Sequence, residues 1–303
     1  MGTNKVGAIA RRTYRDGVEL SILGFGGIVV CGQEQSGAND SVALAIDRGV
    51  NYFDVAPSYF DGEAEIKLGN ALKGKRDGIF LACKTGLRDA KGAKAELERS
   101  LERAHTDHFD LYQFHAVTSY ADVEQILGPG GAGETFLKAR EAGKVKYLGA
   151  SCHSVEAALA LIENFPLDSV LLPINYVCIA NGNFGLQVIE AAKKKGIARL
   201  ALKSLGHTPW AEGEEKAYPK CWYRPVDDRE VARRSLYFTL SQPITAAIPP
   251  GDERLFRMAL DLIADFKPFD DTEQKAILEA AKGITPLFRY PSPDAGTPSL
   301  GKK

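Results

Sequence analysis

Four polar residues of complementary chemistry stand at or just beyond the ends of short apolar segments: Asp54, Tyr59, Lys84 and His115. A charged group at the end of a buried strand is costly unless it is paired or shifts its pKa. A phenol with an ordinary pKa near 10 is a poor acid at neutral pH, but a lysine ammonium beside it lowers that pKa. A carboxylate would position the lysine, and an imidazole would direct a carbonyl oxygen. The set therefore suits proton donation to an oxygen that gains negative charge.

The segments before these residues belong to a repeated alternation of strand and helix patterns. Eight β-prone runs are each followed by a helical pattern, and Ser151 and Lys203 stand at the ends of two further strands. Such alternation favours a parallel sheet, and eight units allow the sheet to close into a (β/α)8 TIM barrel. Chemistry in these barrels lies at the carboxyl ends of the strands. We therefore expect an α/β fold whose site lies at that face.

The expected elements follow from apolar spacing and from the glycines and prolines between them. The predicted strands are 22–25, 51–54, 79–83, 109–114, 146–150, 169–173, 197–202 and 244–248. The predicted helices are 40–48, 63–72, 94–105, 134–142, 155–163, 184–195, 228–241 and 253–266. Residues 204–227, rich in Pro, Gly and charge, predict a long irregular loop.

Segments at both ends complete the expected chain. Tyr14–Ser21 carries Asp16-Gly17 between β-prone runs, which predicts an N-terminal β-hairpin on the floor of the barrel. Residues 271–282 predict an extra C-terminal helix. The sequence thus predicts a single barrel domain over residues 1–285 and a Pro- and Gly-rich tail over residues 286–303.

Composition limits the classes of partner. The 303 residues carry a formal charge of −1, which argues against nucleic acid or a membrane surface as the main partner. No apolar run reaches the ~18 residues of a membrane span, and no secretory signal is apparent. The five cysteines are scattered without Cys-x-x-Cys, and no His/Cys ligand spacing predicts a metal site. We expect a cytoplasmic protein.

Several segments resemble the aldo-keto reductase family from about Tyr14 to Phe266. They are Leu23-Gly24-Phe25-Gly26-Gly27, Phe53–Tyr59 followed by Glu63 and Leu68-Gly69, Lys84-Thr85, and Asp110–His115. The resemblance implies a barrel that binds a nicotinamide cofactor and reduces an aldehyde or ketone. It also implies that Tyr59 is the proton donor, Lys84 its pKa partner, Asp54 the partner of Lys84, and His115 the residue that orients the carbonyl.

The resemblance also implies a cofactor site. Ser151 matches the family serine at the nicotinamide carboxamide, whereas Cys152 stands where the family has Asn and Pro173 where it has Gln, with Asn175 two residues on. The full set of expected cofactor-binding residues is Gly26, Gly27, Ser151, Cys152, Asn175, Lys203, Ser204, Leu205, Gly251 and Arg254.

The loops after the seventh and eighth strands bear on the choice of cofactor, because these loops often hold phosphate in such barrels. Gly251 and the start of the next helix offer backbone N–H groups, and Arg254 suits a 2′-phosphate through paired hydrogen bonds. The carboxylates of Asp252 and Glu253 would repel the 2′-phosphate if they faced it. We expect NADPH to be preferred by a modest factor, with NADH possible.

Two other functions stay open at this stage. A Schiff-base lyase or aldolase on the same fold would use Lys84 or Lys203 as its amine, and borohydride trapping would reveal it. A non-catalytic NADP-binding regulatory subunit would retain the barrel, and the altered nicotinamide contacts favour that reading. In the leading reading the partner is a small-molecule carbonyl substrate. Oligomeric state is left undetermined by the sequence.

Overall fold

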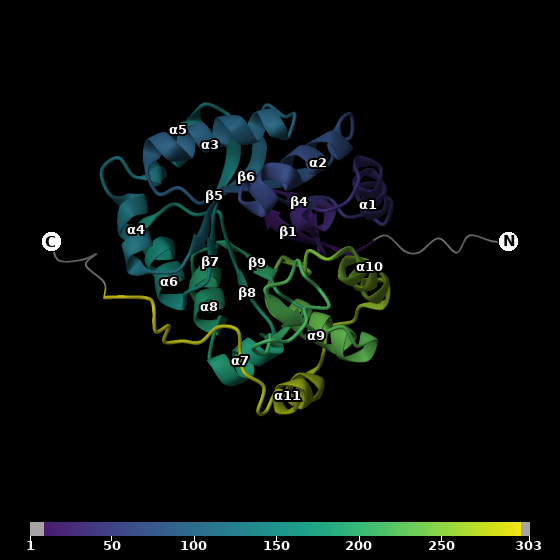
Figure 1. The fold of residues 1–303 in the computed structure, drawn as a ribbon. Coiled ribbons are helices and arrows are strands. Elements are labelled where there is room, and N and C mark those ends of the chain that lie inside the picture. The colour runs from purple at the N-terminus through teal and green to yellow at the C-terminus, as the bar shows by residue number, and fades with distance from the viewer. Residues whose placement is uncertain (1–8, 298–303) are drawn as a thin grey trace.

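An eight-stranded parallel barrel forms the centre of the computed structural model, which describes residues 9–297 (Figure 1). The strands run in the order β12-β9-β8-β7-β6-β5-β4-β3. A bridge between Leu23 and Ala247 joins the first and last strands and closes the ring. The barrel strands are β3 (Phe25–Gly26), β4 (Tyr52–Asp54), β5 (Phe80–Thr85), β6 (Phe109–Val117), β7 (Val145–Cys152), β8 (Ser169–Pro173), β9 (Ala198–Leu202) and β12 (Ala246–Ile248). The predicted (β/α)8 fold is confirmed.

Helices surround the barrel and bury one apolar face against its strands. They are α1 (Gln35–Asp47), α2 (Glu63–Leu72), α3 (Ala90–Arg103), α4 (Tyr120–Leu127), α5 (Ala132–Glu141), α6 (Val155–Asn164), α7 (Tyr176–Gly182), α8 (Leu186–Lys194), α9 (Arg229–Ser241), α10 (Glu253–Leu262) and α11 (Asp271–Ala280). The predicted helix 63–72 matches α2, and the predicted strand 169–173 matches β8. Within residues 9–297, no helix combines the length and apolarity that crossing a membrane requires.

Two helices and a two-stranded hairpin lie where the sequence predicts no such elements. Helix α4 starts at a capping box formed by Ser119 and Asp122, and α7 starts where the Asn175 side chain accepts a hydrogen bond from the Cys178 N–H. Both helices are short, so their apolar spacing gives little signal. The expected irregular loop contains an antiparallel hairpin of β10 (Gly206–Pro209) and β11 (Tyr223–Pro225), whose strands are thirteen residues apart in the sequence.

The predicted N-terminal hairpin closes one end of the barrel. Strands β1 (Arg11–Arg15) and β2 (Val18–Ser21) pair antiparallel around Asp16-Gly17. The ring of Tyr14 packs against Phe80 at 5.0 Å and against Tyr147 at 5.2 Å between ring centroids. These rings join one apolar cluster with strand residues of the barrel interior. Because this end is filled with side chains, a ligand can enter only at the carboxyl ends of the strands.

The C-terminal segment runs across the outside of the barrel rather than away from it (Figure 1). After α11, the Tyr290 N–H donates to the Gly182 carbonyl, the Ser292 N–H to Glu156, and the Tyr120 N–H to the Ala295 carbonyl. These bonds tie residues 290–295 to α7, α6 and α4 in turn. The predicted boundary at residue 285 therefore separates two segments that pack together, and residues 298–303 of the tail lie outside the described residues.

Helices α2 and α3 pack so closely that Gly69 has no room for a side chain. A Cβ there would lie 2.5 Å from the Arg103 carbonyl oxygen and 2.7 Å from the Ala104 Cα. Because backbone cannot move aside cheaply, Gly69→Ala should destabilise the protein by about 1–3 kcal/mol despite alanine's better helix propensity. Urea unfolding measures the free energy. As a control, Gly37→Ala in α1 would meet only the flexible Gln33 side chain, so it should be neutral or stabilising; equal losses would contradict this account.

Candidate active site

A buried ion pair joins the ends of two neighbouring strands. Asp54 ends β4 and Lys84 lies near the end of β5, and their side chains are only 4% and 1% exposed. The Lys84 ammonium donates to Oδ1 of Asp54, while Gln113 donates to Oδ2 at 2.9 Å and the Tyr52 hydroxyl to the same oxygen at 3.3 Å. Both carboxylate oxygens are thus satisfied, as a buried charge requires.

The same ammonium holds the phenol of Tyr59. The Lys84 Nζ lies 3.3 Å from the Tyr59 hydroxyl and 3.2 Å from the Val55 carbonyl oxygen. A tight turn brings the tyrosine back over the strand ends, because the Tyr59 N–H bonds to the Ala56 carbonyl at 3.1 Å. The predicted set Asp54, Lys84 and Tyr59 is therefore a connected chain of charge and hydrogen bonds.

The electrostatics of this chain differ in one respect from the sequence-based expectation. Burial lowers the pKa of Lys84, but Asp54 and Tyr59 outweigh it and leave the pKa above its ordinary value, so the ammonium stays charged. Burial raises the pKa of Tyr59, and this effect exceeds the lowering by Lys84. The predicted lowering of the phenol pKa by Lys84 is present, but in the free protein burial leaves that pKa raised. The phenol therefore stays protonated until an oxygen that gains negative charge accepts its proton.

His115 lies at the end of β6 with its ring against that of Tyr59, at 5.5 Å between centroids and nearly perpendicular. Its Nδ1 is 3.3 Å from the Ser58 hydroxyl oxygen. Burial, with the positive charges of Lys84, Arg88 and Lys203, lowers the pKa of His115 to about 3. The imidazole is consequently neutral at physiological pH and can donate one hydrogen bond without carrying charge.

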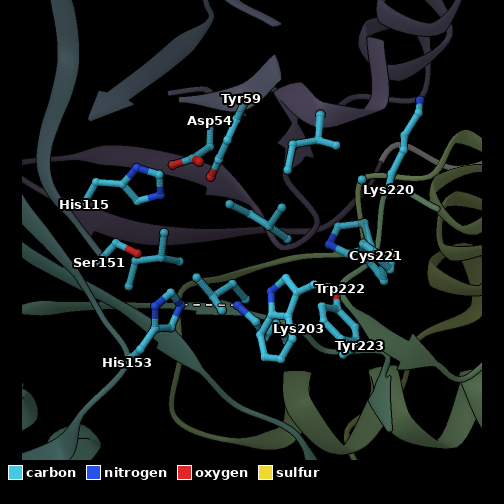
Figure 2. A pocket seen from close by; sticks show the side chains of 18 residues that line it. Asp54, Tyr59, His115, Ser151, His153, Lys203, Lys220, Cys221, Trp222 and Tyr223 are labelled. Carbon is cyan, nitrogen blue, oxygen red and sulfur yellow. Dashed lines mark hydrogen bonds between the residues drawn. The ribbon is translucent and has the colours of Figure 1, made fainter. Parts of the chain in front are cut away.

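A cavity of about 220 Å³ opens over these groups. Figure 2 shows Asp54, Tyr59 and His115 facing Lys203, Trp222 and Tyr223 across it. Eight segments contribute to the lining, which consists of Gly26, Ile28, Asp54, Tyr59, His115, Ser151, His153, Leu171, Leu202, Lys203, Lys220, Cys221, Trp222, Tyr223, Ile248, Pro249, Pro250 and Gly251. Of the predicted cofactor residues, Gly26, Ser151, Lys203 and Gly251 are among them.

The other predicted cofactor residues lie behind the lining. Cys152 and Leu205 are fully buried in the apolar core, and Asn175 caps α7 and donates to the Lys203 carbonyl at 3.2 Å. Ser204 is buried, and its backbone carbonyl accepts a hydrogen bond from the Ser235 hydroxyl at 2.6 Å. Gly27 allows close packing, since a Cβ there would lie 2.8 Å from Val55. Their contact with a cofactor remains a prediction.

Arg254, the last predicted cofactor residue, lies on the surface beside this cavity. Its side chain is 63% exposed, bonds to Asp252 at 3.0 Å and stacks over the Tyr218 ring at 4.4 Å. A further bond reaches the Ala217 carbonyl at 2.8 Å. The guanidinium is therefore held in place by Asp252, Tyr218 and Ala217, with part of its charge balanced by Asp252.

The lining offers a polar group to a ligand. The Ser151 hydroxyl is buried and has no hydrogen-bond partner among residues 9–297. A buried hydroxyl without a partner is costly, so a polar ligand group such as a carboxamide would stabilise it. Gly26 also lines the cavity, where a Cβ would crowd the Ile248 side chain at 3.1 Å. These two features fit a planar amide-bearing ring such as nicotinamide.

Sequence reasoning singled out Lys203 but not the residues that surround it in the cavity. The Lys203 amine lies 3.2 Å from Nε2 of His153 and between 5.5 and 5.9 Å from the ring centroids of Trp222, Tyr223 and Phe288. Burial lowers the pKa of Lys203 to about 7. The residues come from β7, β9, the β10–β11 hairpin and the C-terminal segment, so no local motif could have signalled the cluster. Gln113 was also missed, although a polar residue within an apolar strand is a usable signal.

Comparisons with known proteins identify the family of the chain. The sequence profile described as the aldo/keto reductase family matches residues 23–256. The aldo-keto reductase YhdN of Bacillus subtilis is 32% identical over 206 residues, which cover 62% of this chain and 60% of that protein. The chain belongs to the aldo/keto reductase family, a class of oxidoreductases.

Solved structures show the same fold. The holo form of aldo-keto reductase AKR11C1 from Bacillus halodurans superposes with a TM-score of 0.72 at 21% identity, covering 92% of this chain and 98% of that one. An aldo-keto reductase from Klebsiella pneumoniae in complex with NADPH gives a TM-score of 0.70 at 17% identity, covering 95% and 100%.

Two partly buried histidines, His115 and His153, predict a marked acid sensitivity. Burial and nearby lysines hold the pKa of His115 at about 3 and that of His153 well below its ordinary value. The unfolded chain takes up these protons below about pH 6.5, while the folded chain does not. Stability should therefore fall as the pH drops from about 6.5 toward 3, with a slope of up to about 1.4 kcal/mol per pH unit for each ring.

Urea unfolding at pH 7.5, 6 and 5 measures this slope. The double variant His115→Gln/His153→Gln removes both protonation sites from the unfolded state, so its stability should change less with pH. An unchanged slope in the double variant would show that other groups, such as His207 and the carboxylates, cause the acid sensitivity.

Proposed function

We propose that the chain reduces an aldehyde or ketone to an alcohol with NAD(P)H, and that Tyr59 donates the proton. The observation that carries this proposal is the buried chain from Asp54 through Lys84 to the Tyr59 hydroxyl, which ends at the cavity beside His115. Family membership supports the reaction class. The proposed partner is a small-molecule carbonyl compound, and the cytoplasmic location and the lack of nucleic-acid or membrane partners stay predictions from composition.

Each residue contributes a separate part of the chemistry. When bound, the reduced nicotinamide supplies the hydride, and the residues of this chain manage the proton. His115, neutral at working pH, donates a hydrogen bond that places the carbonyl oxygen near the phenol. As that oxygen gains charge, the Tyr59 O–H gives up its proton, and the Lys84 ammonium stabilises the phenolate that remains. Asp54 keeps the ammonium charged and fixed.

We propose that the cavity binds a nicotinamide cofactor and that NADPH is preferred over NADH by a modest factor. The buried Ser151 hydroxyl suits the carboxamide, and Gly251 and Arg254 suit phosphate at the rim. Asp252 already pairs with the Arg254 guanidinium, so only part of its charge is available to a 2′-phosphate. That competition is the reason for expecting a modest rather than a large preference.

The two alternative functions receive less support. The Lys84 amine is a poor nucleophile for a Schiff base, because Asp54 holds it in its charged form. Lys203 is the remaining amine of that alternative. A regulatory subunit would not require the phenol, ammonium and carboxylate to be aligned at a cavity, yet all three are.

Fluorescence titration with NADPH and NADH, followed by a panel of aldehydes and ketones, tests the proposal directly. We expect binding of a reduced nicotinamide and its oxidation only when a carbonyl compound is present. Cofactor binding without turnover of any carbonyl would favour the regulatory subunit. Borohydride trapping of a carbonyl compound on Lys203 would favour the Schiff-base reading.

Tyr59→Phe tests the proton donor. The variant loses only the hydroxyl, so carbonyl reduction should fall by about 10²–10⁴, the usual contribution of a general acid, while cofactor affinity stays nearly unchanged. Lys84→Met should cause a comparable loss, and the double variant should be little worse than either, because the two residues act as one unit. Steady-state kinetics give the rates. Near wild-type turnover in Tyr59→Phe would rule out the mechanism.

Arg254→Ala tests the choice of cofactor. A hydrogen bond to a charged group contributes roughly 1.5–3 kcal/mol, so the variant should bind NADPH about tenfold or more weakly and NADH almost as before. Fluorescence titration of both cofactors gives the two dissociation constants. As a control, Arg257→Ala removes a nearby arginine that pairs with Glu253, and it should leave both constants unchanged. An equal loss for both cofactors in Arg254→Ala would show that Arg254 does not contact the 2′-phosphate.

A further inference from the structure

Strand β6 is irregular directly after His115. Ala116 has a φ of +52°, in the left-handed region that residues other than glycine rarely adopt. The ladder with β7 shifts here, since Phe114 pairs with Ala150 whereas Val117 pairs with Cys152. Three steps on one strand thus oppose two on the other, which is a β-bulge. Bulges of this kind re-aim a side chain. The re-aimed side chain here is that of Val117, because alternation from Leu111 and Gln113 already turns His115 to the barrel interior.

The bulge changes which side chains of β6 face the helices and which face the cavity. In a regular strand the side chains alternate, so residues 114 and 117 would face opposite sides. Phe114 and Val117 instead both lie in the apolar core, and the Phe114 ring stacks on Phe136 of α5 at 3.8 Å. The extra residue lets both of them face the helices while His115, between them, lines the cavity.

Arg88 holds the bulge in place. Its NH2 group donates to the carbonyl oxygens of His115 at 2.9 Å and Ala116 at 3.2 Å, and its Nε donates to Asp122 at 2.9 Å. Both side chains of the ion pair are mostly buried, at 14% and 21% exposed. Because a bulge interrupts the ladder, the two carbonyls need partners of this kind. Asp122 is itself fixed by the capping box at the start of α4.

The ring of His115 is held separately. Ser58, the residue before Tyr59, places its hydroxyl oxygen 3.3 Å from Nδ1. Because Nδ1 faces Ser58, Nε2 is the ring nitrogen that remains for a substrate oxygen. A neutral imidazole has a single N–H, so it can donate to that oxygen only when the proton is on Nε2. Nδ1 is then an acceptor, and the Ser58 hydroxyl donates to it.

We infer that Ser58 and Arg88 are positioning residues for His115: Ser58 holds Nδ1 and so leaves Nε2 free for a substrate oxygen, and Arg88 fixes the backbone from which the ring extends. This inference rests on the proposed carbonyl reduction, in which His115 orients the substrate. Neither residue touches the reacting atoms, so each acts through His115.

Nitrogen NMR of protein with ¹⁵N-labelled histidine reads the tautomer without any turnover. His115→Gln assigns the His115 signals. We expect Nε2–H in the wild type, a shifted Nδ1 signal in Ser58→Ala, which loses the hydrogen bond to that nitrogen, and the wild-type pattern in Ser58→Thr, which keeps the hydroxyl. An Nδ1–H tautomer in the wild type, or no change in Ser58→Ala, would overturn the role of Ser58 even if the protein reduced no carbonyl compound.

Kinetics test the same residue in the working enzyme. Ser58→Ala should lower kcat by about three- to tenfold, the range of one hydrogen bond, with cofactor affinity unchanged. In the His115→Gln background the same substitution should have no further effect, because the two residues act as a unit. An additional loss in that background would show that Ser58 acts by another route.

Arg76 provides a matched control for Arg88. It sits near the other end of β6, where it pairs with Asp110 at 2.9 Å and donates to the carbonyls of Ile79 and His108. Arg88→Gln and Arg76→Gln should both lower the unfolding midpoint in urea. Only Arg88→Gln should also lower kcat, by about tenfold or more, and shift the His115 nitrogen signals. Equal kcat in the two variants, or unshifted His115 signals in Arg88→Gln, would reduce Arg88 to a structural role and overturn its part of the inference.

Discussion

The ion pair between Asp54 and Lys84 is the constraint on which the site depends. Removing two charges from water costs several kcal/mol per ion, and a buried pair is tolerated only when every remaining oxygen and proton is satisfied. Three neighbouring strands meet that condition, since β4 supplies the carboxylate, β5 the ammonium and β6 the amide of Gln113. The geometry that satisfies the pair also leaves one ammonium proton for the Tyr59 phenol. The same contacts thus join the barrel strands and position the proton donor.

Elements outside the regular strand–helix alternation shape the rest of the site. Helix α4 anchors Asp122 and through it Arg88, the β10–β11 hairpin carries Trp222 and Tyr223 to the cavity, and the C-terminal segment adds Phe288. None of these elements contributes to closing the barrel. They stand at the carboxyl ends of the strands, where a barrel tolerates variation because its own stability resides in the interior and the floor. They therefore determine what surrounds the reacting groups.

The sequence alone predicted the barrel and its catalytic end. Regular alternation of apolar runs with helical spacing is a local signal, and so is a charged residue that ends a strand, as Asp54 and Lys84 do. The carboxyl ends of parallel strands in one barrel lie together. The sequence therefore predicted that the polar residues at these ends converge, without knowledge of any contact. Helix α2 and strand β8 were predicted with their bounds because glycine or proline breaks the chain beside them.

Tertiary structure decided the properties that depend on burial and on distant segments. Burial of the Tyr59 phenol raises its pKa by more than Lys84 lowers it. The spacing of residues in the sequence does not tell how deeply this loop tyrosine is buried. The cluster around Lys203 joins four segments that share no motif. The bulge at Ala116 depends on Arg88, twenty-eight positions earlier in the chain. Local patterns determine which elements form and which ends meet, whereas pKa values, tautomers and bulges arise from three-dimensional contacts that a linear pattern does not contain.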